Sequence, residues 1–262
     1  MRYLSKTNRI VIKIGTSSLV CADGTINTAN IKEYVAVISK LQNEGKEVVL
    51  VSSGAIGAGL SKLCYKRHEM SNIEKQVAAT VGQCLVMRAY TNLFEEHNHI
   101  VSQVLISKYM IDAEKRTENL KNVFETFLQK KVVPIVNEND ALMLHELEFK
   151  NNDTLSAYIS NLIHADLLII LTDVDGVFDK NPNQYSDAKL ISNITEITDE
   201  IKIGLCGASH NFGVGGMITK LVAAEIAAKS NTKTLILNSN KAQLICDALQ
   251  NEEVGTYINL NN

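Results

Sequence analysis

Short apolar runs rich in Val and Ile alternate along this chain with longer segments of helical periodicity, and this alternation constrains the fold most strongly. The apolar runs cover residues 9–14, 47–51, 100–106, 132–136, 167–171 and 234–237. They lack polar/apolar alternation, which is typical of strands buried on both faces of a parallel sheet. Helical patterns lie between them, at about residues 31–41, 73–96, 117–130, 153–164, 216–229 and 241–250. The order strand, helix, strand predicts an α/β fold with three α/β/α layers around a mostly parallel, doubly wound sheet.

Composition narrows the class of protein. A chain of 262 residues with 45% hydrophobic content can bury a full core, and we predict a single domain over residues 1–262. No apolar stretch reaches the ~18 residues of a membrane helix, and the N-terminus lacks the apolar block of a secretion signal, so we expect a cytoplasmic protein without membrane contact. The five cysteines are odd in number and form no C-x-x-C pair, which favours reduced thiols. A net charge of −3 and the absence of Trp argue against nucleic-acid binding.

Glycine-rich turns follow the first two predicted strands. Lys13 precedes Gly15, and the second strand leads into Ser53 and Gly54. Ligands bind beyond the carboxyl ends of strands in doubly wound sheets, and glycines there let the backbone approach a phosphate. An ordinary strand-to-helix turn explains either segment alone equally well. The Walker A pattern and the protein-kinase signatures are absent, so any ATP site has another architecture.

A third glycine-rich turn, at residues 213–220, opens a helical pattern late in the chain. Lys220 would lie near the positive end of that helix, where an anion is favoured. For Lys220 alone, an exposed position on an alanine-rich helix is the better interpretation.

Two polar clusters come between these turns, at residues 137–140 directly after an apolar run and at residues 151–153 where a helix begins. Their amides and carboxylates suit the ammonium and carboxylate groups of an amino acid, although Asp153 could merely cap its helix. A third acidic segment, residues 171–178, also follows a strand but does not have the spacing of a calcium-binding EF-hand.

Taken together, these segments resemble a known family. VIKIGTS, VSSGAIGAG, KQVAATVGQ, VVPIVNENDA, NNDTLSA, LLTDVDGVFDKNP and GVGGMITK, in this order from about residue 9 to 257, are similar to the amino acid kinase superfamily and within it to the glutamate 5-kinases. LLTDVDG and the late glycine turn occur across the superfamily, aspartate kinases included. KQVAATVGQ and NENDA resemble the glutamate 5-kinases in particular.

The resemblance implies roles for individual residues. It implies that Lys13 and Lys220 clamp the phosphates of the nucleotide. Asp153 is implied to position these two lysines. The implied glutamate-binding residues are Ser53, Gly54, Asn137, Asp140 and Asn152. The implied nucleotide-binding residues, besides the two lysines, are Gly15, Thr172, Asp173, Gly213, Val214, Gly215, Gly216, Met217, Ile218 and Thr219. The family usually has Asp in place of Asn151 and Thr in place of Val214, so a negative charge and a hydroxyl are missing here.

The implied activity is ATP-dependent phosphorylation of the side-chain carboxylate of L-glutamate to L-glutamate 5-phosphate, the first step of proline biosynthesis. Mg²⁺ would come with ATP rather than occupy a metal site of the protein. Proline is the implied feedback inhibitor, and a homo-oligomer is expected. Many relatives also carry a C-terminal domain resembling RNA-modification modules, and this chain ends where that domain would begin.

Two alternatives remain open at this point. One is another carboxylate kinase of the superfamily, acting on aspartate or N-acetylglutamate. The other is a catalytically silent amino-acid sensor, against which the joint presence of Lys13, Lys220 and Asp153 argues, because sensing needs no phosphate clamp.

Overall fold

The computed structural model describes residues 4–64, 70–108, 114–142, 149, 151–182, 184–199, 201 and 216–260. They form two compact units. Unit 1 comprises Met1–Lys13 and Asp153–Asn262, and unit 2 comprises Ile14–Asn152. Each unit is described by itself.

The described residues of unit 2 include three parallel strands, β2 (Glu47–Ser52), β3 (Ile100–Ile106) and β4 (Val132–Glu138). β4 pairs with both neighbours, with Leu50 opposite Ile135 on one side and Val101 opposite Val133 on the other. Most residues of β2 and β4 are fully buried, which explains why their sequences are continuous apolar runs.

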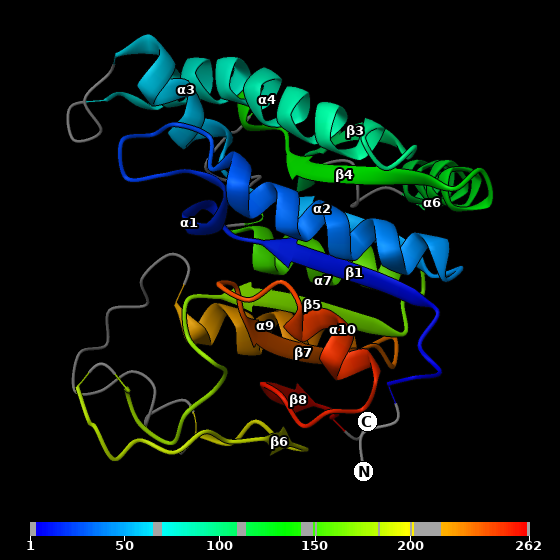
Figure 1. Ribbon diagram of the computed structural model, residues 1–262, viewed down its shortest axis with the longest axis vertical. Coiled ribbons are helices and arrows are strands. Elements are labelled where there is room, and N and C mark those ends of the chain that lie inside the picture. The colour runs from blue at the N-terminus through cyan, green and yellow to red at the C-terminus, as the bar shows by residue number, and fades with distance from the viewer. Residues whose placement is uncertain are drawn as a thin grey trace. The chain divides into compact units, whose positions relative to one another are not determined.

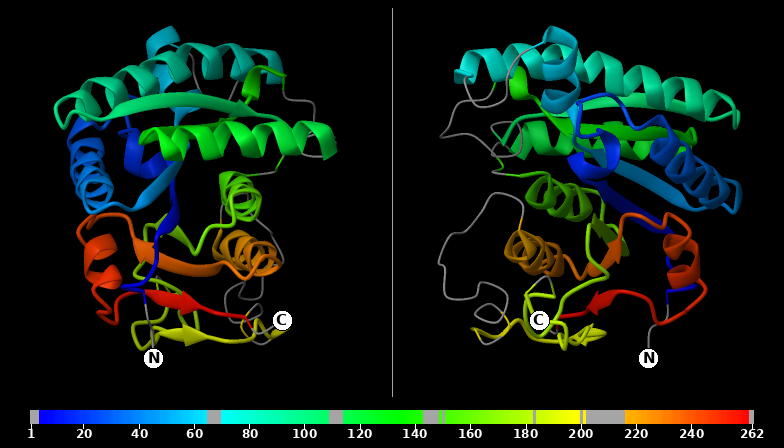
Figure 2. Two further views of the ribbon diagram at one scale, coloured as in Figure 1. Left: turned by 90° about the vertical axis from the view of Figure 1, so that its right-hand side faces the viewer. Right: turned by 60° about the vertical axis from the view of Figure 1, so that its left-hand side comes forward.

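Helices cover both faces of these strands in unit 2. Those in the described part of the unit are α1 (Thr16–Leu19), α2 (Thr28–Asn43), α3 (Ala55–Leu63), α4 (Asn72–Glu95) and α6 (Glu114–Gln129), with a short 3₁₀ helix, η1 (Asp140–Leu142). The side chain of Asn27 caps α2, and a capping box of Ser71 and Glu74 starts α4. In Figure 2, α2 and α6 lie on opposite faces of the strands.

Where the structure describes it, unit 1 contains five strands in the order β1 (Arg9–Ile14), β5 (Leu167–Thr172), β7 (Lys233–Asn238), β8 (Thr256–Ile258) and β6 (Asn193–Ile194). Neighbours pair in parallel except β7 and β8, which are antiparallel. The helices among the described residues of this unit are α7 (Asn152–Leu162), α9 (Met217–Ala228) and α10 (Leu244–Leu249). Figure 1 shows α9 and α10 beside β7, and Figure 2 shows them on opposite faces of it.

These elements confirm the predicted α/β class with a mostly parallel sheet. β1 and β3 span the predicted residues, β2, β4 and β5 continue one or two residues further, and β7 is longer by one residue at each end. The sequence did not predict β6 and β8, because runs of two and three residues are too short to show a period. The single-domain prediction stays a prediction. Within the described part of the chain, no helix has the length and apolar composition needed to cross a bilayer.

Candidate functional site

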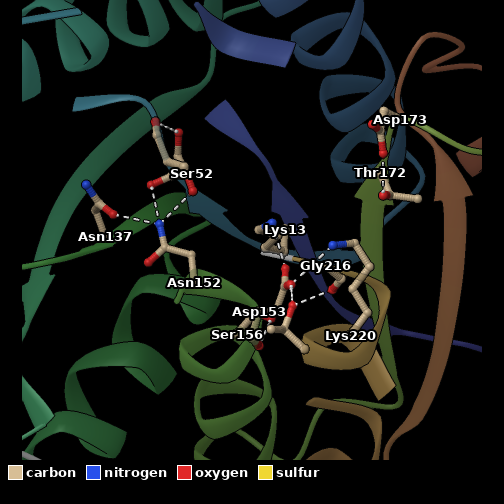
Figure 3. A network of polar contacts seen from close by, with 12 residues as sticks. Lys13, Ser52, Asn137, Asn152, Asp153, Ser156, Thr172, Asp173, Gly216 and Lys220 are labelled. Carbon is tan, nitrogen blue, oxygen red and sulfur yellow. Dashed lines mark hydrogen bonds and ion pairs between the residues drawn. The ribbon is translucent and has the colours of Figure 1, made fainter. Parts of the chain in front are cut away.

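A buried carboxylate in unit 1 contacts two buried ammonium groups. Asp153 lies in the first turn of α7, and its Oδ1 is 2.6 Å from the Nζ of Lys13, near the end of β1. Its Oδ2 is 3.3 Å from the Nζ of Lys220, in the first turn of α9. Figure 3 shows the carboxylate between the two lysines. We call these three residues the lysine triad.

The triad corrects two of the interpretations drawn from sequence. Lys220 is only 4% exposed, so it does not lie on an outer helix face. The alanine-rich pattern of α9 provides the space for this, since small side chains let the helix pack closely against its unit. Asp153 is 1% exposed, and its carboxylate contacts both lysines and a hydroxyl instead of serving merely as a helix cap.

Burial and charge act in opposite directions on the triad. Burial tends to raise the pKa of Asp153, but the positive charges of Lys13 and Lys220 outweigh it, and the pKa of this carboxyl lies below its ordinary value. Burial lowers the pKa of Lys220, and the nearby charge of Lys13 lowers it further, against the opposing effect of Asp153. Two ammonium groups thus share one carboxylate in a nearly dry environment, which favours an additional anion.

The start of α9 adds a hydroxyl to the triad. Thr219 Oγ1 lies 2.7 Å from Asp153 Oδ2 and 2.7 Å from the carbonyl oxygen of Gly216, the N-cap residue of α9. Ile218 is half-buried in the same turn, and Met217 packs against a hydrophobic cluster that includes Val177 and Leu221. The remaining predicted residues of this loop, Gly213, Val214 and Gly215, lie outside the described residues.

Two further predicted nucleotide-binding residues lie at the carboxyl end of β5. Thr172 is the last residue of that strand, and its Oγ1 donates to Asp173 Oδ1 at 3.2 Å. The charge of Asp173 raises the pKa of Lys220, although it is a lesser influence than burial. Figure 3 labels both residues and draws the hydrogen bond between them.

A second group of polar side chains lies in unit 2. Asn152 Nδ2 donates to Ser53 Oγ at 2.7 Å and to Asn137 Oδ1 at 2.9 Å, and it lies 3.4 Å from the carbonyl oxygen of Ser52. Ser53 directly follows β2, Asn137 ends the buried part of β4, and Asn152 is the first residue of α7. We call Ser53, Asn137 and Asn152 the amide cluster. It brings together three of the five predicted glutamate-binding residues.

A fourth predicted glutamate-binding residue, Gly54, has a backbone conformation that favours glycine. Gly54 follows Ser53 with a φ of +98°, in the left-handed region that glycine adopts without strain, and it is the N-cap of α3. Asp140 opens η1, three residues after Asn137 in the chain. Gly15 is the N-cap of α1, and its carbonyl oxygen accepts from the backbone N–H of Ser18 at 3.2 Å.

Sequence reasoning gave no role to two residues of α4 that contact this region. Gln83 Oε1 accepts from Asn137 Nδ2 at 3.0 Å, and the hydroxyl groups of Tyr90 and Ser52 lie 3.1 Å apart. Gln83 belongs to the KQVAATVGQ segment, whose resemblance to the glutamate 5-kinases is visible in the sequence but assigns no role to this residue. Gln83 and Tyr90 are seven positions apart, two helical turns, and therefore face the same direction.

The described residues contain no group of three or more His, Cys, Asp or Glu side chains that could hold a metal ion. Both oxygens of Asp153 already contact ammonium or hydroxyl groups. The acidic side chain of the triad therefore fits lysine positioning better than direct metal ligation.

Comparison with known proteins agrees with this arrangement. The model of the amino acid kinase family matches residues 8–238. A glutamate 5-kinase of Clostridium acetobutylicum is 45% identical over 255 residues, which are 97% of this chain and 96% of that protein. A glutamate 5-kinase of Clostridium perfringens is 43% identical over 259 residues, again 97% of this chain and 96% of the relative. Among solved structures, carbamate kinase from Giardia lamblia has the same fold, with a TM-score of 0.71 and 19% identity over 98% of this chain and 100% of its own. The chain belongs to the amino acid kinase family and, within it, to the glutamate 5-kinases.

Proposed function

We propose that this protein transfers the γ-phosphoryl group of ATP to the side-chain carboxylate of L-glutamate, giving ADP and L-glutamate 5-phosphate, the first step of proline biosynthesis. The observation that carries this proposal is the lysine triad, in which two buried ammonium groups share one buried carboxylate. The relatives named glutamate 5-kinase, which match nearly the whole chain, support glutamate as the acceptor.

The reaction needs cations rather than a base. The side-chain carboxyl of glutamate has a reference pKa of about 4.3, so it is already an anion at neutral pH and has no proton to lose. One of its oxygens forms a bond to the γ-phosphorus of ATP while the bond from that phosphorus to the β,γ-bridging oxygen breaks, and ADP leaves with the electron pair. The main obstacle is the repulsion between two anions.

Lys13 and Lys220 would remove that obstacle. Negative charge accumulates on the transferring group and on the leaving oxygen as the reaction proceeds, and fixed cations in a dry site stabilise it without reorganisation. Asp153 would hold the two ammonium groups in place and keep them charged. It would not accept a proton, because the lysines hold its pKa below the ordinary value.

The amide cluster would bind the acceptor. Ser53, Asn137 and Asn152 offer hydroxyl and amide groups that match the ammonium and carboxylate of an amino acid. Asn152 and Asp153 are consecutive residues, so their Cα atoms are about 3.8 Å apart across one peptide bond. The proposed acceptor-binding residue Asn152 and the central residue of the lysine triad are therefore consecutive in the chain, at the start of α7.

Nucleotide binding would involve Thr172, Asp173, Gly15 and the glycine-rich turn before α9. We propose that Mg²⁺ arrives on the phosphates of ATP and retains several of its waters. When bound, it would shield phosphate charge. Asp153 need not ligate it, because both of its oxygens are engaged.

The test is an assay of ADP release with a panel of acceptors, in which hydroxylamine traps the acyl phosphate as a hydroxamate. We expect hydroxamate from L-glutamate and far less from aspartate or N-acetylglutamate, since the acetylated compound lacks a free ammonium group. Hydroxamate from aspartate alone would identify another carboxylate kinase of the family. Binding of glutamate without ADP release would identify a silent sensor.

We further propose that proline inhibits the enzyme by competing with glutamate. Proline carries the same α-carboxylate and a charged amine, and the amide cluster and Asp140 would contact those groups. Glutamate titrations at fixed proline concentrations test this, and we expect the KM for glutamate to rise while kcat stays constant. An unchanged rate at millimolar proline would contradict it.

Two wider expectations belong with this function. We propose that the protein acts in the cytoplasm, where ATP and glutamate are available. We also expect a homo-oligomer, which sedimentation velocity of the purified chain would test.

A further inference from the structure

The structure assigns a positioning role to Gln83, whose side-chain oxygen accepts from the buried amide of Asn137 and so maintains the chain of amide hydrogen bonds in which Asn152 Oδ1 is turned toward the ammonium group of the acceptor. This inference rests on the proposed function, since it concerns how the acceptor is held. It also explains KQVAATVGQ, a segment that resembles the glutamate 5-kinases but has no role in the chemistry described above.

Close contact between α3 and α4 brings Gln83 to the amide cluster. A Cβ atom on Gly82 would lie 1.8 Å from the carbonyl oxygen of Ala55, and one on Gly59 would lie 1.7 Å from that of Ala78. The two helix backbones therefore touch, as only glycine permits at these positions. This contact fixes the position of α4 within unit 2. Gln83, directly after Gly82, is 8% exposed and reaches Asn137.

The backbone carbonyl oxygen of Ser52 can only accept a hydrogen bond, and this determines which group of each amide donates and which accepts. Asn152 Nδ2 faces the backbone carbonyl oxygen of Ser52, which has no proton to give, so the NH₂ group of Asn152 must point that way. The same NH₂ group is 2.9 Å from Asn137, which must therefore present its oxygen. Asn137 then turns its own NH₂ group toward Gln83, and Gln83 must present Oε1. The direction of each amide thus depends on the next.

Burial makes Gln83 necessary for this order. Asn137 is 4% exposed, so water cannot easily replace Gln83 as the acceptor for its NH₂ group. Without Gln83, the buried NH₂ group of Asn137 would lose this acceptor, so Asn137 would have to shift or turn over, and a turned amide would place its NH₂ group against that of Asn152. Two donors would then face each other at hydrogen-bond distance, and Asn152 would have to turn as well.

In this arrangement the amide cluster offers one acceptor and one donor, which match the ammonium and the carboxylate of an amino acid. Asn152 Oδ1 takes part in none of the cluster's hydrogen bonds among the residues that the structure describes, so it can accept from an ammonium group. Ser53 Oγ accepts from Asn152, which leaves its proton available for a carboxylate oxygen. A reversed chain would present an NH₂ group to the ammonium of glutamate, donor against donor.

The test compares two variants of Gln83 by steady-state kinetics. Gln83→Met has a similar size but no strong acceptor, whereas Gln83→Glu keeps an accepting oxygen whether or not it is ionised. We expect Gln83→Met to raise the KM for glutamate by about tenfold or more, with the KM for ATP unchanged and kcat altered less than about threefold. Gln83→Glu should stay within about threefold of wild type in the KM for glutamate. Equal effects of the two variants would overturn the inference.

A double mutant distinguishes an effect of Gln83 on the orientation of the amides from an effect on side-chain packing. Asn137→Asp carries only acceptors, so it can accept from Asn152 whichever way it is turned, and the direction no longer depends on Gln83. In that background Gln83→Met should change the KM for glutamate less than about twofold. A tenfold effect that persists there would show a packing role and refute the relay. If the wild-type chain releases no ADP with glutamate, the proposed function fails. If wild type is active and Gln83→Met matches Gln83→Glu, only this inference fails.

Discussion

The central prediction concerns Asp153→Asn, which removes the shared negative charge of the lysine triad without changing its shape. The carboxylate is 2.6 Å from one ammonium and 3.3 Å from the other, so at an effective dielectric constant of about 20 it attracts them by roughly 6 and 5 kcal/mol. Desolvation of the three groups offsets much of this attraction. Removal of one partner from a buried ion pair costs about 3–5 kcal/mol of folding stability, and we expect a loss in that range.

The effect on catalysis should be larger than the effect on ATP binding. Without Asp153, the ammonium groups of Lys13 and Lys220 repel each other in a dry environment, and one of them can lose its proton or turn away. Loss of one fixed cation near the transferring group corresponds to about 3 kcal/mol, roughly a hundredfold in kcat. The KM for ATP should not rise, because the triphosphate supplies the missing negative charge. For the same reason, saturating ATP should restore part of the lost stability.

Urea unfolding with and without ATP, together with steady-state ADP release, measures both effects. Asp187→Asn is a matched control, since Asp187 is also 2.6 Å from a lysine, Lys180, but its side chain is 75% exposed. An exposed ion pair contributes little to stability, so this variant should resemble wild type. If Asp153→Asn keeps kcat within about threefold of wild type, the positioning role assigned to the carboxylate is wrong.

Three further predictions follow from the same contacts. Lys13→Gln and Lys220→Gln should each lower kcat about a hundredfold or more while changing the KM for glutamate little, because cations near the transferring phosphoryl group act mainly on the transition state. Burial lowers the pKa of Lys220, so its charge is lost at lower pH than in an ordinary lysine; kcat should therefore fall at alkaline pH, and Lys220→Arg should move that fall to higher pH in a kcat profile. Gly82→Ala should lower the free energy of unfolding, measured in urea, by several kcal/mol, because the added Cβ would lie 1.8 Å from a carbonyl oxygen of α3. Gly57→Ala is the control: the nearest neighbour of its Cβ would lie at 3.5 Å, so this variant should be neutral or stabilising by up to about 1 kcal/mol. Equal stability of the two alanine variants would contradict the close contact of α3 with α4.

The sequence by itself determined the class of fold. Short continuous apolar runs such as those of β4 and β5 indicate strands buried on both faces, and the helical segments between them favour parallel neighbours. The short strands β6 and β8 carry no such pattern, and β8 pairs against the parallel order. Their position depends on long-range pairing with β7 and on the hydrophobic cluster around Val177, which local periodicity cannot reveal.

The sequence also indicated the chemistry, because the order of its motifs identifies the family and with it the candidates Lys13, Lys220 and Asp153. Periodicity alone favoured an exposed Lys220, and only the packing of α9 showed it to be buried against a carboxylate 67 positions earlier in the chain. The partner of Asn137, in strand β4, is likewise distant in the chain, since Gln83 lies 54 positions away on helix α4. Such contacts depend on how closely helix and strand backbones approach, which for α3 and α4 is decided by two glycines without a Cβ atom. Residue types and their order therefore follow from the sequence, whereas the sharing of one carboxylate and the direction of the amide chain follow from tertiary packing.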